Sequence, residues 1–127
     1  MFKRVDHVEI VPTDAEKTIE FYVNAFGFEI RSRNEVKAPP MKEVNYLALG
    51  DTVIEVIAVD NPAEKSEAAW QVGYRAIALE VEDMSEAVNL LKGKGIEVTW
   101  GPVDLGNSIR AEIRDPDGLI IELRHWK

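Results

Sequence analysis

The sequence predicts an α+β protein built from two tandem βαβββ units, and two observations indicate it. The order strand, helix, strand, strand, strand can be traced twice, over residues 1–59 and 74–127. Each copy also ends in an apolar run with one glutamate near its middle, Glu55 in the first and Glu122 in the second. Because an internal duplication determines the fold, we expect one domain in which these two modules flank a connector at residues 60–73.

In the first module, alternating polar and apolar residues predict a strand over residues 5–11, with His7 and Glu9 on the same face. A helix follows, since Thr13 and the glutamate three residues later have capping-box spacing. Gly27 ends this helix in the usual role of a C-terminal glycine. The remaining elements expected in this module are strands at residues 28–32, 44–49 and 52–59 and a loop at residues 34–42.

In the second module, Asp83 and the glutamate three residues later again predict a helix start, and Gly95 its end. The turn Asp115-Pro-Asp-Gly precedes the last strand: proline presets φ, aspartates bond to nearby backbone amides, and glycine supplies a positive φ. Because strand side chains alternate, His125 falls on the face opposite Glu122. The other elements expected are strands at residues 74–81, 96–100, 108–114 and 119–123 and a loop at residues 101–107.

Glu55 and Glu122 stand out because each is a carboxylate among apolar neighbours. Burying a bare carboxylate costs several kcal/mol or more, so each needs water, a partner or a metal. When the modules are aligned, His7 falls opposite Ala76 and Glu55 opposite Glu122. If the two sheets curve together, His7, Glu55 and Glu122 line one cleft, and one histidine with two carboxylates suits a divalent metal ion.

Ordinary interpretations of the same residues stay open. A histidine near a strand start is commonly a surface or hydrogen-bonded residue, and the two glutamates could face solvent on half-exposed strands. Without a metal, two facing carboxylates would repel, and one would tend to stay protonated. Arg110 and Arg114 could hold an anionic substrate or could form a solvated face.

Composition excludes several classes of function. A net charge of −8 argues against nucleic acid and anionic membranes as partners, and no apolar run approaches the length of a membrane span. The first residues lack the apolar core of a signal peptide. With no cysteine, disulfides and thiolate chemistry are absent, and we expect a cytoplasmic protein that acts on a small molecule.

Three motifs resemble the vicinal oxygen chelate superfamily, which includes glyoxalase I, bleomycin resistance proteins and dioxygenases. They are Asp6-His7-Val8 on the first strand, residues 77–83 leading into the second helix, and residues 115–122 at the last turn and strand. The resemblance covers essentially the whole chain and is strongest to glyoxalase I-like proteins. It implies the glyoxalase-like fold, in which two βαβββ modules form a curved, cleft-bearing mixed sheet, and a homodimer.

In this superfamily each unit contributes two metal ligands, so the resemblance implies His7, Glu55, residue 76 and Glu122. Ala76 departs from the pattern, because the most similar enzymes usually carry histidine there. This departure disfavours dioxygenase chemistry. Glu55 makes the resemblance to glyoxalase I stronger than that to methylmalonyl-CoA epimerase, another member of the superfamily, which more often has glutamine at this position. The implied cofactor is a divalent metal ion: Ni, Zn, Co, Mn or Fe.

Two functions are then expected. The first is a metal-dependent lyase or isomerase of the lactoylglutathione lyase or epimerase type, acting on a small oxygenated carbonyl substrate. In it Glu122 is both a ligand and the catalytic base that abstracts a proton, and the metal stabilises the enediolate. The alternative is a non-catalytic small-molecule binding or resistance protein with the same cleft, and Ala76 favours it.

Overall fold

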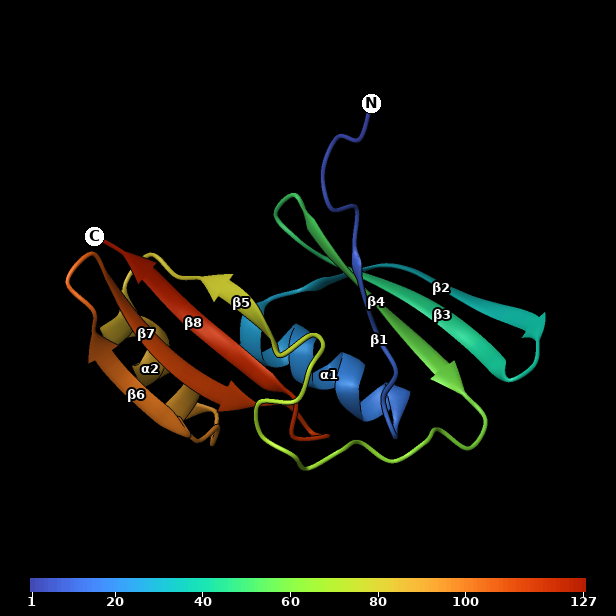
Figure 1. Ribbon diagram of the computed structural model, residues 1–127. Coiled ribbons are helices and arrows are strands. Elements are labelled where there is room, and N and C mark those ends of the chain that lie inside the picture. Colours follow the sequence, from blue (N-terminus) through green and yellow to red (C-terminus); the bar gives the residue numbers. More distant parts are fainter. The chain divides into compact units, whose positions relative to one another are not determined.

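The computed structural model describes residues 1–127 and divides into two compact units, Met1–Lys65 and Ser66–Lys127. Each unit contains one helix and one four-stranded mixed sheet, as Figure 1 shows. The α+β class and the twice-repeated order of elements are therefore confirmed. In chain order the elements are β1 (Val8–Ile10), α1 (Ala15–Phe26), β2 (Glu29–Ala38), β3 (Met41–Leu49), β4 (Thr52–Val59), β5 (Ala76–Glu80), α2 (Met84–Gly93), β6 (Trp100–Asp104), β7 (Ser108–Arg114) and β8 (Ile120–Trp126).

The sheet of the first unit has the order β1-β4-β3-β2, in which β1 runs parallel to β4 and the other pairs are antiparallel. The helix α1 contacts β4 and buries Ile19 and Tyr22, which are three residues apart on one helical face. Leu47 and Val56 supply fully buried positions on the sheet. This apolar layer holds β1 and β4 side by side, and these two strands carry the candidate site.

Helix starts depend on side-chain caps, and the two units differ from expectation in one detail. The N-cap of α1 is Asp14, whose carboxylate accepts from the Lys17 amide at 3.1 Å, so the prediction of Thr13 as the cap was wrong by one residue. The N-cap of α2 is Asp83, as predicted, and it accepts from the Glu86 amide at 2.9 Å. Gly27 closes α1 with a φ of 81°.

Two predicted boundaries in the first unit were wrong. The first strand is only Val8–Ile10, because only these residues pair with β4. The predicted loop at residues 34–42 is a hairpin: β2 continues to Ala38 and β3 begins at Met41. The two prolines between them occupy only the turn, and antiparallel pairing between the strands overrides the polar, loop-like composition of the segment.

The sheet of the second unit has the order β5-β8-β7-β6, with β5 parallel to β8. Its edge strand β6 begins at Trp100, whereas the sequence predicted a strand at residues 96–100 and a loop after it. The Gly101–Pro102 pair predicts the end of a strand. An edge strand nevertheless tolerates proline, because its outer edge has no neighbouring strand to which a backbone amide must donate. The connector contains no helix, and neither helix of the chain is long and apolar enough to cross a membrane.

The predicted turn before β8 is present and explains where that strand begins. The Asp115 carboxylate accepts from the Asp117 and Leu119 amides, both at 2.9 Å, and Gly118 has a φ of 78°. On β8, His125 accepts through Nδ1 from the backbone amide of Met84 at 3.2 Å. His125 thus serves helix packing, on the face that alternation places opposite Glu122.

Candidate metal site

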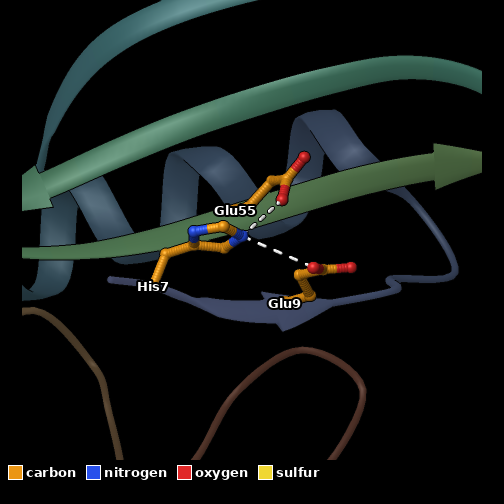
Figure 2. A group of neighbouring side chains, drawn as sticks. All are labelled: His7, Glu9 and Glu55. Carbon is orange, nitrogen blue, oxygen red and sulfur yellow. Dashed lines mark ion pairs between the residues drawn. The ribbon is translucent and has the colours of Figure 1, made fainter. Parts of the chain in front are cut away.

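The parallel pairing of β1 with β4 brings three potential metal ligands together in the first unit. Glu9 is the direct pairing partner of Glu55, and His7 lies two residues before Glu9, on the same side of the chain. His7 Nε2 lies 3.0 Å from Glu55 Oε2 and 3.4 Å from Glu9 Oε2. Figure 2 shows the imidazole placed between the two carboxylates.

The other nitrogen of His7 also has a carboxylate partner. His7 Nδ1 lies 2.8 Å from Asp6 Oδ2, and this bond, with smaller contributions from Glu9 and Glu55, raises the pKa of His7 against the opposing effect of desolvation. A carboxylate that accepts from Nδ1 selects the tautomer whose Nε2 is free to bind a metal. Asp6 therefore orients His7 and increases its basicity.

Glu55 is the buried member of the group, with 7% of its surface exposed. Tyr46 on β3 is its antiparallel pairing partner and packs edge-on against the His7 ring, with centroids 5.8 Å apart. Desolvation, followed by the charge of Glu55 and a hydrogen bond to it, raises the pKa of Tyr46. The Tyr46 hydroxyl is therefore a protonated donor to Glu55 that helps to hold this carboxylate in place.

The donor atoms fit a divalent ion. The ligand atoms of His7, Glu9 and Glu55 all lie within 4.8 Å of one another. Nitrogen and oxygen ligands about 2.0–2.2 Å from one ion are separated by roughly 3 Å or slightly more, which matches both histidine–carboxylate distances. A position that stabilises a proton on Nε2 between two carboxylates is equally suited to a metal cation, which replaces that proton.

Of the residues predicted from sequence, the structure brings His7 and Glu55 together and places Glu122 in the second unit. Each Glu122 oxygen accepts from an arginine there: Oε1 from Arg110 Nε at 2.6 Å and Oε2 from Arg124 Nε at 3.1 Å. Desolvation pushes the pKa of Glu122 upward, but the two arginines outweigh it and lower this pKa. Glu122 is therefore held ionised by protein cations.

Sequence reasoning missed Glu9 and Tyr46 as members of the group. For Glu9 a signal was present, because its two-residue spacing from His7 already places both side chains on one strand face. For Tyr46 there was none, since its position opposite Glu55 depends on the antiparallel register of β3 with β4.

Comparison with known proteins identifies the family to which this fold belongs. The profile of the Glyoxalase/Bleomycin resistance protein/Dioxygenase superfamily matches residues 4–123, so the chain belongs to this superfamily. The resemblance inferred from the three motifs is thereby confirmed. A glyoxalase family protein from Enterococcus faecalis has a structure that matches with a TM-score of 0.84 at 29% sequence identity, over 97% of this chain and 98% of that one.

Among curated relatives, several are named lactoylglutathione lyase. Lactoylglutathione lyase GLX1 of Arabidopsis thaliana is 32% identical over 125 residues, which is 95% of this chain but only 44% of that protein. The chain thus spans less than half the length of this relative. A probable lactoylglutathione lyase of Vibrio cholerae is 33% identical over 128 residues, covering 94% of this chain and 88% of its own length.

Proposed function

We propose that this protein is a metal-dependent lyase or isomerase of the glyoxalase I type that acts on a small oxygenated carbonyl compound. The observation that carries the proposal is the convergence of His7, Glu9 and Glu55 on one point, with Asp6 behind the histidine. Relatives named lactoylglutathione lyase support the reaction class.

His7 and Glu55 hold the metal ion in this proposal, and Glu9 is a third donor from the same unit. Glu122 remains the further ligand that the superfamily pattern implies. The ion, when bound, supplies a Lewis acid that polarises the substrate carbonyl. Histidine and carboxylate ligands suit several divalent metals, so these residues are compatible with Ni, Zn, Co, Mn or Fe.

The proton step is assigned to Glu122. It takes a proton from the carbon next to the carbonyl, as a general base. Arg110 and Arg124 keep it ionised, so it begins the reaction in the form that accepts a proton. The same arginines make it a weaker base, and we therefore expect turnover to require that at least one of these bonds loosens.

Calorimetric titration with NiCl₂ or ZnCl₂ tests the ligands, and the formation or breakdown of lactoylglutathione, the compound in the names of these relatives, tests the reaction. We expect about one ion per chain, and a loss of roughly 100-fold or more in affinity for His7→Gln and Glu55→Gln, since each removes a ligand from an open site. Glu122→Gln should abolish turnover and weaken binding. Glu20→Gln, an exposed carboxylate on α1, is the matched control and should change neither. If the parent takes up no metal, or if the Glu122→Gln variant binds and turns over like the parent, the assignment fails.

The alternative is a non-catalytic binding or resistance protein, and one observation favours it. The usual histidine ligand is replaced by Ala76, and the glutamate on the neighbouring strand is engaged by two arginines. In this case the parent protein should bind small oxygenated ligands with or without metal, and no turnover should appear after metal is added. Metal content of the protein as isolated separates the two functions.

Three further expectations belong to the same proposal. We propose a homodimer, because unpaired edge strands favour pairing with another chain, and sedimentation as a monomer at micromolar concentration would contradict it. A cytoplasmic location is consistent with the absence of cysteine. We also propose that modules 1–59 and 74–127 form a single functional domain around the connector at residues 60–73.

A further inference from the structure

The two units use the same strand register for different chemistry. In the first unit Glu9 pairs with Glu55, and in the second Ala78 pairs with Glu122. Ala78 is therefore the counterpart of Glu9, and Ala76, two residues earlier, is the counterpart of His7. The second unit has lost both donors that accompany the glutamate in the first unit, so its face is not a second copy of the metal site.

Two arginines occupy this face instead. Arg110 on β7 and Arg124 on β8 are direct cross-strand partners, and Glu112 and Glu122 form the next pair on the same side. Arg110 donates through Nε to Glu122 and its Nη2 lies 2.6 Å from Glu112. Arg124 donates through Nε to Glu122 and through Nη1 to the Ser108 hydroxyl at 3.0 Å. Both guanidinium groups thus converge on one carboxylate, that of Glu122.

These contacts orient the two arginines and leave one Nη nitrogen of each available to a ligand. No hydrogen bond occupies Nη1 of Arg110 or Nη2 of Arg124, and their side chains stay 17% and 21% exposed. Each guanidinium also lies over a tryptophan: Arg110 Cζ is 4.9 Å from the Trp100 ring centroid and Arg124 Cζ is 5.2 Å from that of Trp126. A guanidinium fixed in this way loses little side-chain entropy when it binds an oxyanion.

The charge balance of the cluster favours an anion. Arg75 extends the network, with Nη2 3.6 Å from Glu112 Oε2, so three arginines face two glutamates. These five ion-paired side chains together carry one net positive charge, whereas Glu80, the exposed pairing partner of Arg124 on β5, is not ion-paired with them and the whole chain has a net charge of −8. Partial burial keeps the attraction for an anion stronger than it is in bulk water.

We propose that Arg110 and Arg124 form a binding site for the carboxylate or phosphoryl group of a small organic acid on the β7–β8 face of the second unit. The oxyanion binds the unoccupied Nη1 of Arg110 and Nη2 of Arg124, beside Glu122, and Trp100 and Trp126 border the site. Both groups suit this arrangement, because two oxygens of a carboxylate or phosphoryl group can each accept from the remaining Nη nitrogen of one arginine. The site needs no metal ion, so it can be tested independently of the proposed metal-dependent activity.

Isothermal calorimetry and tryptophan fluorescence of the metal-free protein test this site, with inorganic phosphate and with succinate as separate probes at ionic strength held constant with chloride. We expect saturable binding of one anion per chain. Arg110→Met and Arg124→Met should each weaken it by about tenfold or more, because each removes a charge-assisted donor pair. Glu112→Gln should tighten it several-fold, since it removes a negative charge from the cluster. Arg31→Met, which removes an exposed arginine of β2, is the matched control and should bind like the parent.

The two probes identify the oxyanion: binding of phosphate alone indicates a phosphoryl group, binding of succinate alone a carboxylate, and binding of both a site that accepts either. If neither probe shows saturable binding, the proposal is overturned. It is also overturned if Arg31→Met weakens binding as much as Arg110→Met and Arg124→Met do. If a methionine variant does not fold, Arg110→Lys and Arg124→Lys decide. They keep the charge, but an ammonium group cannot bond to Glu122 through one fixed nitrogen and present another to the oxyanion. Binding equal to that of the parent would then refute the site.

Discussion

Asp115 offers a direct test of how the last turn positions β8 and therefore Glu122. The side chain is 4% exposed, and its Oδ1 accepts from the amides of Asp117 and Leu119, both at 2.9 Å. Replacing Asp115 with alanine removes both bonds and leaves two backbone donors without their acceptor. Hydrogen bonds to a charged group contribute about 1.5–3 kcal/mol each. Because Asp117 and Leu119 are only half-buried, water replaces part of the loss, and we expect about 3 kcal/mol in all.

Urea unfolding followed by tryptophan fluorescence measures this change, since Trp100 and Trp126 both belong to the second unit. For a chain of this length, about 3 kcal/mol also lowers Tm by roughly 10 °C. Asp115→Asn keeps an acceptor oxygen but loses the charge, so its cost should be only about 1 kcal/mol. The graded order of alanine, asparagine and parent is the expected signature of these two bonds.

Asp51 provides a matched control, because it occupies the turn before the other glutamate-bearing strand. It is exposed, and its carboxylate makes no hydrogen bond or ion pair, so Asp51→Ala should change stability by less than about 0.5 kcal/mol. An Asp115→Ala variant that loses no more than its Asp51→Ala counterpart would refute the view that these bonds hold the turn. Equal losses for Asp115→Asn and Asp115→Ala would show that the charge, not the acceptor geometry, matters.

Two other predictions concern the site residues. Asp6→Asn should weaken metal binding by about tenfold. This is the low end of the effect expected when a histidine ligand loses its hydrogen-bond partner, because the Asp6 side chain is 82% exposed. Competition with a chelator measures the affinity, and an unchanged affinity would exclude Asp6 from orienting His7. In the metal-free protein, the pKa of Glu122 is lowered by Arg110 and Arg124. The contribution of ionised Glu122 to folding stability should be complete above about pH 4.3 and decline as pH falls through the lowered pKa, because the unfolded chain then binds the proton more readily. Carbon-detected NMR titration should show this pKa rising in the Arg110→Met variant; no rise would exclude Arg110 as the cause.

Local physics explains which elements could be predicted from the sequence. Capping residues, C-terminal glycines and the Asp-Pro-Asp-Gly turn act on their immediate neighbours, so they identify helix and strand positions without knowledge of the fold. Boundaries that depend on pairing could not be found this way. The strand β6 crosses Gly101 and Pro102 because β7 offers it a ladder, and β2 continues past its predicted end because β3 lies beside it.

For the candidate site, two features could be predicted from residue spacing: His7 shares a strand face with Glu9, and one glutamate lies within an apolar strand of each unit. Both follow from alternation along a strand, which needs no knowledge of neighbouring strands. The partners of those glutamates depend instead on how the strands pair. The parallel register of β1 with β4 brings Glu55 to His7, whereas the antiparallel register of β7 with β8 brings Arg110 to Glu122. Such registers result from long-range packing of whole strands, and so two glutamates in similar sequence surroundings have different electrostatic environments.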